Sequence, residues 1–154
     1  AEYLSKTDDP AAYVSETARQ KGLEVFRRCP DSLVVAADTV VVVDGEILEK
    51  PESEADARRT LRRLAGARHE VLTGVALFRE SQERTFFERT SVFFSELQDA
   101  DIDAYVATGE PLDKAGSYGI QGKAGAFVER IEGDYYNVVG LPMNRLSREL
   151  ASFL

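Results

Sequence analysis

The chain has 154 residues and a formal net charge of −8, with 44% hydrophobic and 30% charged residues. This length suits one domain with a substantial core, and the composition is ordinary for a globular protein. The negative charge argues against a nucleic-acid partner, because such binding relies on a basic face that neutralises phosphates. It leaves room for a nucleotide that is bound through a divalent cation.

Neither a membrane span nor a disulfide is expected from the sequence. No apolar run approaches the ~20 residues that a membrane-spanning helix needs. Cys29 is the only cysteine, which excludes an internal disulfide and fits a reducing compartment. We therefore expect a cytoplasmic protein that has no membrane partner.

The first predicted element is a helix. Asp9 and Pro10 have the N-cap and first-turn preferences of a helix start, and we expect the helix to end between Gly22 and Pro30. Its last inward position is Lys21, which either covers apolar surface with its stem, the commoner case, or directs its amine into a cleft. The predicted inner face comprises Tyr13, Val14, Thr17, Ala18 and Lys21.

A Val-rich segment, residues 33–43, follows this helix and contains one charged residue, Asp38. Its composition predicts a strand buried on both faces, closed by a turn at Asp44-Gly45. A short return strand after the turn would bring Lys50 back beside Asp38. A carboxylate among apolar side chains needs a cation, a metal or several hydrogen-bond donors. Asp38 and Lys50 therefore form either a structural ion pair or part of a functional site, and the residues alone leave both open.

The middle of the chain predicts a helix and then a hairpin. The helix begins at Ser53 as N-cap and ends at Gly66, and two long strands follow, over residues 69–78 and 85–97. His69 is the only histidine, so neither a catalytic triad nor a histidine metal cluster can form, and we expect it to be structural. The predicted buried face of the helix comprises Ala57, Leu61 and Leu64.

The last third contains the most unusual segment, residues 109–122, which reads GEPLDKAGSYGIQG. Glycines permit close backbone approach, so this segment either wraps phosphates or bases or is an irregular connection. A helix capped by Asp99 precedes it. A hairpin of two strands, over residues 126–132 and 135–139, is predicted after it. A closing helix is predicted from Pro142 onward.

The order of these elements predicts an α/β fold. Helices should flank an extended, mixed and partly antiparallel sheet, with a central cleft. We expect this cleft to hold Asp38, Lys50 and part of the Gly-rich segment.

Three separated stretches resemble the Maf (septum-formation-inhibitor-like) nucleoside triphosphate pyrophosphatases. They are ADTVVVVDGEILEKP at residues 37–51, the stretch from Leu64 to Gly74, and GEPLDKAGSYGIQG together with the later NVVGLP. The resemblance covers the chain from Tyr13 to its C-terminus. The segments ETARQK and FSEL are also similar to the Maf-like domain of N-acetylserotonin O-methyltransferase-like proteins. The resemblance implies a Maf/ITPase-like fold.

It also implies a house-cleaning hydrolase that cuts a nucleoside triphosphate to the monophosphate and pyrophosphate, using Mg²⁺ or Mn²⁺. Asp38 matches the family's proton acceptor and a metal ligand. Glu2 matches, more loosely, a glutamate near the metal. Lys21 and Lys50 match substrate-binding lysines.

Base preference is implied by two other positions. Thr39 and Gln121 match residues that favour dTTP and UTP, and Lys114, in the Gly-rich segment, is expected to bind substrate as well. Maf proteins also carry a Ser-x-Ser-Pro-Arg-Arg motif that residues 1–154 lack. We therefore expect one Maf-like domain without the N-terminal strand and helix that bear this motif, unless a further stretch precedes Ala1. The alternative is a catalytically silent nucleotide-binding or interaction module, and a homodimer is possible in either case.

Overall fold

The computed structural model describes residues 9–154, so the predicted metal ligand Glu2 lies outside the described residues. Its centre is a five-stranded sheet with the order β2-β1-β3-β4-β5, in which every neighbouring pair is antiparallel. The predicted class, an extended sheet flanked by helices, is confirmed. The strands are β1 (Val34–Val43), β2 (Glu46–Leu48), β3 (Arg68–Arg79), β4 (Gln82–Phe94) and β5 (Val128–Glu132).

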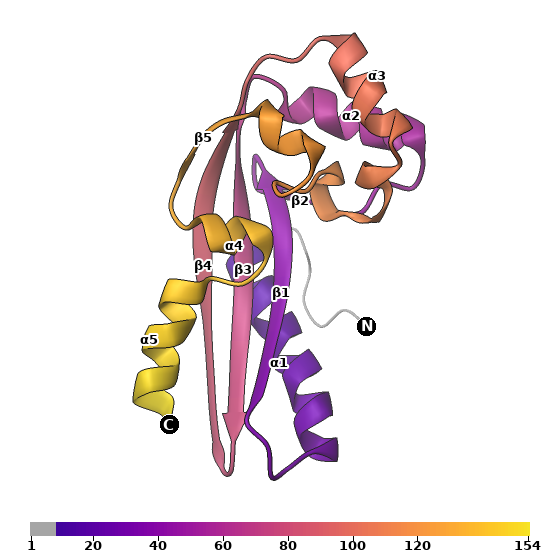
Figure 1. Ribbon diagram of the computed structural model, residues 1–154. Helices are drawn as coiled ribbons and strands as arrows, with labels where there is room; N and C mark the ends of the chain where they lie inside the picture. Colours follow the sequence, from indigo (N-terminus) through magenta and orange to yellow (C-terminus); the bar gives the residue numbers. More distant parts are fainter. Residues whose placement is uncertain (1–8) are drawn as a thin grey trace.

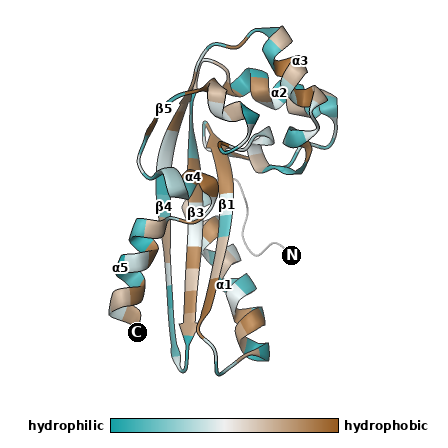
Figure 2. Ribbon diagram, viewed as in Figure 1, coloured by the Kyte–Doolittle hydropathy of each residue, from teal (hydrophilic) through white to brown (hydrophobic). Residues whose placement is uncertain are grey.

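Helices cover both faces of the sheet (Figure 1). Helix α1 lies on one face, α4 and α5 lie on the other, and α2 and α3 lie together at one end. Figure 2 shows that the hydrophobic positions concentrate on β1 and β3, while the tip of the β3–β4 hairpin is hydrophilic. Within residues 9–154, no helix combines the length and apolarity needed to cross a bilayer. The helices are α1 (Pro10–Arg28), α2 (Glu54–Leu64), α3 (Asp99–Ala107), α4 (Tyr135–Val139) and α5 (Met143–Phe153).

Helix α1 begins and ends as predicted, at Pro10 and Arg28, and it passes through Gly22 without a break. The Asp9 carboxylate accepts hydrogen bonds from the backbone N–H groups of Ala11 and Ala12 at 3.1 and 3.3 Å. Gly22 is buried, and a Cβ at this position would lie 2.6 Å from the Phe78 ring. The glycine therefore serves close helix–sheet packing, and the helix continues for another turn and a half to Arg28.

The first half of β1 is more exposed than predicted. Val35 is 42% exposed, whereas Val40 and the three valines after it are 5–7% exposed. The two faces differ, since Val34 packs against α1 and is 7% exposed, whereas Val35 points to the opposite face. β2 pairs with β1 only from Val41 to Val43. Among the described residues, β1 is thus the sheet edge before Val41, and burial on both faces holds only for its second half. Asp38 lies on this edge.

The predicted third hairpin is wrong, because residues 135–139 form helix α4 and not a strand. The Asp134 carboxylate accepts a hydrogen bond from Tyr136 N at 2.8 Å, which caps the helix start. Gly140, with φ of 134°, ends it. β5 pairs with β4 instead, and α4 packs on β3 and β4. Two smaller boundaries also differ, since Gln98 and not Asp99 caps α3, and the β3–β4 loop has two residues.

Candidate active site

Two adjoining cavities lie on either side of the β1 edge. We call the first the Asp38 cleft, about 370 Å³, and the second the Gln121 pocket, about 280 Å³. Thr39 and Ala115 line both of them. Because successive side chains of a strand point to opposite faces, Asp38 lines only the Asp38 cleft, whereas its neighbour Thr39 also lines the Gln121 pocket.

The Asp38 cleft brings together residues that the sequence predicted to be close. Asp38, Lys50 and Ala115 of the Gly-rich segment all line it, so the predicted juxtaposition is confirmed. The structural Asp38–Lys50 ion pair, one of the two alternatives left open, is not the contact that forms, because Asp38 Oδ1 contacts Lys21 Nζ at 2.7 Å. Asp38 is also less buried than predicted, with 17% of its side chain exposed. The cleft thus combines the carboxylates of Asp38, Glu49 and Glu52 with the amine of Lys50, and Lys21 of α1 reaches its edge through the contact with Asp38.

The close packing of α1 on the sheet explains why Lys21 reaches Asp38. Gly74 lies opposite Asp38 in the β1–β3 register. A Cβ at Gly74 would overlap the backbone carbonyl of Val14 in α1. The absence of a side chain therefore lets the α1 backbone rest directly on β3, and Lys21, about two turns further along α1, meets the β1 edge.

On the other face, Thr39 joins a chain of buried polar groups. Its Oγ1 lies 2.9 Å from Thr73 Oγ1 and 3.4 Å from the carbonyl oxygen of Gly140. Thr73 donates in turn to the carbonyl oxygen of Asn137 at 3.2 Å. Neither Thr73 nor Asn137 was predicted to belong to the site, and Asn137 was predicted to lie in a strand. The signal that could have found it is the capping pattern of Asp134 and Gly140 around it.

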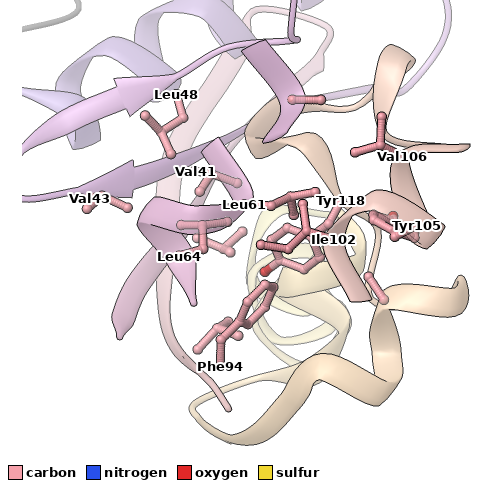
Figure 3. Packing of buried hydrophobic residues seen from close by; sticks show 14 residues of the cluster. Val41, Val43, Leu48, Leu61, Leu64, Phe94, Ile102, Tyr105, Val106 and Tyr118 are labelled. Carbon is pink, nitrogen blue, oxygen red and sulfur yellow. The ribbon is translucent and has the colours of Figure 1, made fainter. Parts of the chain in front are cut away.

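Tyr118 forms an apolar wall of the Gln121 pocket. Figure 3 shows its ring among Leu61, Ile102 and Phe94, with its hydroxyl pointing into this cluster. The hydroxyl lies 2.6 Å from His69 Nε2. Burial lowers the pKa of His69 to about 4 and raises the pKa of Tyr118, so both are neutral at pH 7. His69 is therefore structural, as predicted, and Tyr118 presents its ring and not its hydroxyl to the pocket.

Glu110 ties the two ends of the Gly-rich segment together. Its Oε2 accepts a hydrogen bond from the Tyr105 hydroxyl at 2.5 Å, and its Oε1 accepts one from Lys123 N at 3.4 Å. Gly122 leaves room for this carboxylate, since a Cβ there would overlap it. Desolvation and the bond to Glu110 raise the pKa of Tyr105. The segment is thus a closed loop of tight turns, and this fixes the side of the pocket that carries Gln121.

Comparison with known proteins agrees with this geometry. The family model described as Maf-like protein matches residues 1–153. The chain belongs to the Maf-like protein family. It is similar to proteins named dTTP/UTP pyrophosphatase from Bacillus cereus (strain AH820), Bacillus thuringiensis subsp. konkukian and Bacillus cytotoxicus. Each is 51% identical over 152 residues, which cover 99% of this chain and 80% of the relative.

The other residues predicted to bind substrate lie around the Gln121 pocket. Gln121 is exposed and lines the pocket together with Lys114. The Lys114 amine contacts Asp113 at 3.2 Å, and its stem passes over Gly119, where a Cβ would lie 2.7 Å from Lys114 Cε. Of the residues predicted to bind substrate or metal, the structure thus places all but Glu2 at one of the two cavities or in contact with a residue that lines one.

The carboxylates of this Maf-like chain suit a metal that is shared with a substrate. Within residues 9–154, no three or more His, Cys, Asp or Glu side chains are grouped so that they could hold a metal ion by themselves. Mg²⁺, however, is usually bound by one or two carboxylates together with waters and substrate phosphates. Asp38, at the edge of a cleft that also carries Lys50, fits that kind of site.

Proposed function

We propose that this Maf-like protein hydrolyses dTTP and UTP to the monophosphate and pyrophosphate. The observation that carries the proposal is the pairing of a charged cleft with a mainly apolar pocket across a shared wall. The cleft offers lysine amines and the Asp38 carboxylate, beside Glu49 and Glu52, to a triphosphate and its metal, while the pocket offers Thr39 and Gln121 to a pyrimidine. The relatives named dTTP/UTP pyrophosphatase support the same substrates.

The chemistry requires water to attack the α-phosphorus. The water oxygen forms a bond to that phosphorus as the bond to the bridging oxygen of the leaving pyrophosphate breaks. Asp38 takes the proton of the water as general base, or holds the metal that binds the triphosphate. Lys21 and Lys50 stabilise the negative charge that builds on the phosphate oxygens. A bound Mg²⁺ or Mn²⁺ would neutralise further charge on the triphosphate.

No covalent intermediate is needed in this scheme. His69 is buried and neutral behind the pocket wall, and Cys29 is exposed at the far end of α1. Neither lines the Asp38 cleft. The proposed scheme therefore uses direct attack by water and gives His69 and Cys29 no part.

The sequence also supports proposals about the binding partner and the cellular compartment. A net charge of −8 favours free nucleotides over nucleic acid, and the single cysteine favours the cytoplasm. A homodimer stays a prediction.

The reaction itself is the first test. With Mg²⁺ or Mn²⁺ added, the purified protein is expected to release pyrophosphate, and not orthophosphate, from dTTP and UTP. Coupled assays for the two products distinguish these outcomes. Orthophosphate as the main product would reject the proposed bond cleavage, and release of neither product would favour the silent nucleotide-binding module.

Base preference is the second test. Gln121→Ala removes an amide that can donate to and accept from a base edge, and is expected to lower kcat/KM for UTP by a factor of about 5 to 150, as for the loss of one such contact. GTP hydrolysis should change less. Gln82→Ala, at the distant hairpin tip, is the matched control and should leave both unchanged. An unaltered ranking of dTTP, UTP, CTP and GTP in Gln121→Ala would reject the role.

A further inference from the structure

The direction of the hydrogen bonds around Asn137 is fixed by its neighbours. Asn137 is fully buried, and its side-chain nitrogen lies 3.1 Å from the Val71 carbonyl oxygen and 3.3 Å from that of Glu88. Carbonyl oxygens only accept, so the amide nitrogen must face them and the amide cannot be flipped. This anchors α4, and with it the Asn137 carbonyl, against β3 and β4.

The anchored carbonyl then determines what Thr73 can do. Thr73 is fully buried, and its hydroxyl lies 3.2 Å from the Asn137 carbonyl oxygen. A buried carbonyl requires a donor, and a threonine hydroxyl has one proton to give. Once that proton is committed to Asn137, Thr73 Oγ1 can only accept from Thr39, at 2.9 Å.

The proton of Thr39 is consequently turned into the protein. It points to Thr73 Oγ1 or, at 3.4 Å, to the Gly140 carbonyl oxygen, and both positions lie on the protein side of the hydroxyl. Thr39 lines the Gln121 pocket, so what it can offer to a ligand there is a lone pair. Gln121 cannot set such a preference by itself, because its amide carries donors and an acceptor and can turn either way.

We infer that Thr73 and Asn137 hold Thr39 as a fixed hydrogen-bond acceptor, which makes the pocket select pyrimidines that have an N–H at position 3. Uracil and thymine have that donor, whereas N3 of cytosine is itself an acceptor. Two acceptors facing each other leave a desolvated lone pair unpaired, which is the kind of mismatch that gives strong discrimination. The inference rests on the proposed function for the choice of nucleobase, and it makes Thr73 a positioning residue.

The first experiment measures binding and so does not depend on hydrolysis. Calorimetric dissociation constants of UMP and CMP are expected to show a clear preference of the wild type for UMP. Thr73→Val keeps the shape but removes the acceptor, so the Thr39 hydroxyl can turn. The UMP-over-CMP preference should then fall about tenfold, with tighter CMP binding contributing to the change. Thr73→Ser restores the hydroxyl and should restore the preference.

Thr85→Val is the control. Thr85 also lies in the sheet, on β4, but it is exposed and lies opposite Ala76 and not beside Thr39 or Thr73. Its replacement should leave the UMP-over-CMP preference unchanged. A loss of the preference in both valine variants would overturn the inference.

A ligand analogue covers the case in which Thr73→Val does not fold. The wild type should bind 3-deaza-UMP, which carries carbon in place of N3, about tenfold more weakly than UMP. Equal binding of UMP, CMP and 3-deaza-UMP by the wild type would overturn the inference, as would an unchanged preference in a folded Thr73→Val. Pyrophosphate release from UTP would still uphold the proposed function in either case.

Discussion

Replacing Asp38 by asparagine is expected to lower kcat for pyrophosphate release from dTTP and UTP at least about 100-fold, the usual effect of losing a positioned base. The substitution keeps the shape of the side chain but removes its charge and most of its basicity. The free energy of unfolding should hardly change. Lys21 is 56% exposed, and an ion pair of that exposure contributes only ~0–1 kcal/mol.

A second ion pair of α1 provides the control for this experiment. Arg19 contacts Glu83 at 2.8 Å, and this pair joins α1 to β4 at exposed positions away from the cleft. Glu83→Gln likewise removes the carboxylate of an ion pair between α1 and the sheet, and it should leave kcat unaltered. If Asp38→Asn matches the wild type in kcat while remaining folded, Asp38 is not the base or the metal ligand, and the catalytic proposal fails.

The sequence was a good guide where local interactions decide the outcome. The start of α1 at Pro10, the turn at Asp44-Gly45 and the cap of α2 at Ser53 depend on residues within a few positions of one another, and all three are confirmed. Lys50 could be placed near Asp38 for the same reason, because a tight turn returns the chain beside the preceding strand.

It was a poor guide where partners are far apart in the chain. Asp38 pairs with Lys21 and not with Lys50, because the choice depends on how closely α1 approaches the sheet. The exposure of Val35 depends on which face of β1 the helices cover. Neither the approach of α1 to the sheet nor the covering of β1 can be obtained from the spacing of apolar residues. That spacing gives the buried face of an element but not its neighbours.

Residues 135–139 were mistaken for a strand because Tyr-Tyr-Asn-Val-Val has high strand propensity. Tertiary contacts override that propensity here, since the buried Asn137 amide nitrogen of α4 donates to carbonyl groups of both β3 and β4. The Gly-rich segment was correctly expected to border the site. Its closure by Glu110, however, requires Tyr105 from α3 and could not be predicted from glycine content.

The close approach of α1 to the sheet leads to a prediction on stability and activity together. Gly74→Ala is expected to lower the free energy of unfolding by about 1–3 kcal/mol, the usual range for overpacking, with a value near the upper end. The added Cβ would overlap the backbone of Val14 and approach Ser15 N at 2.7 Å. Because these are backbone atoms, no rotamer change can relieve the overlap, and α1 itself must move.

That movement should affect the site as well as the fold. Lys21 is carried by α1 and contacts Asp38, which lies on β1 opposite Gly74, so a displaced helix lengthens the 2.7 Å contact. We expect Gly74→Ala to reduce kcat severalfold even at temperatures where it is fully folded. Gly45→Ala is the control: nothing lies within 4 Å of its Cβ position, and its φ of +79° costs only the ~1–2 kcal/mol of a left-handed residue. Urea unfolding and kcat measured on the two variants separate backbone strain from helix displacement. A Gly74→Ala protein with wild-type stability and turnover would show that α1 can shift freely, and that its seat on Gly74 does not position Lys21.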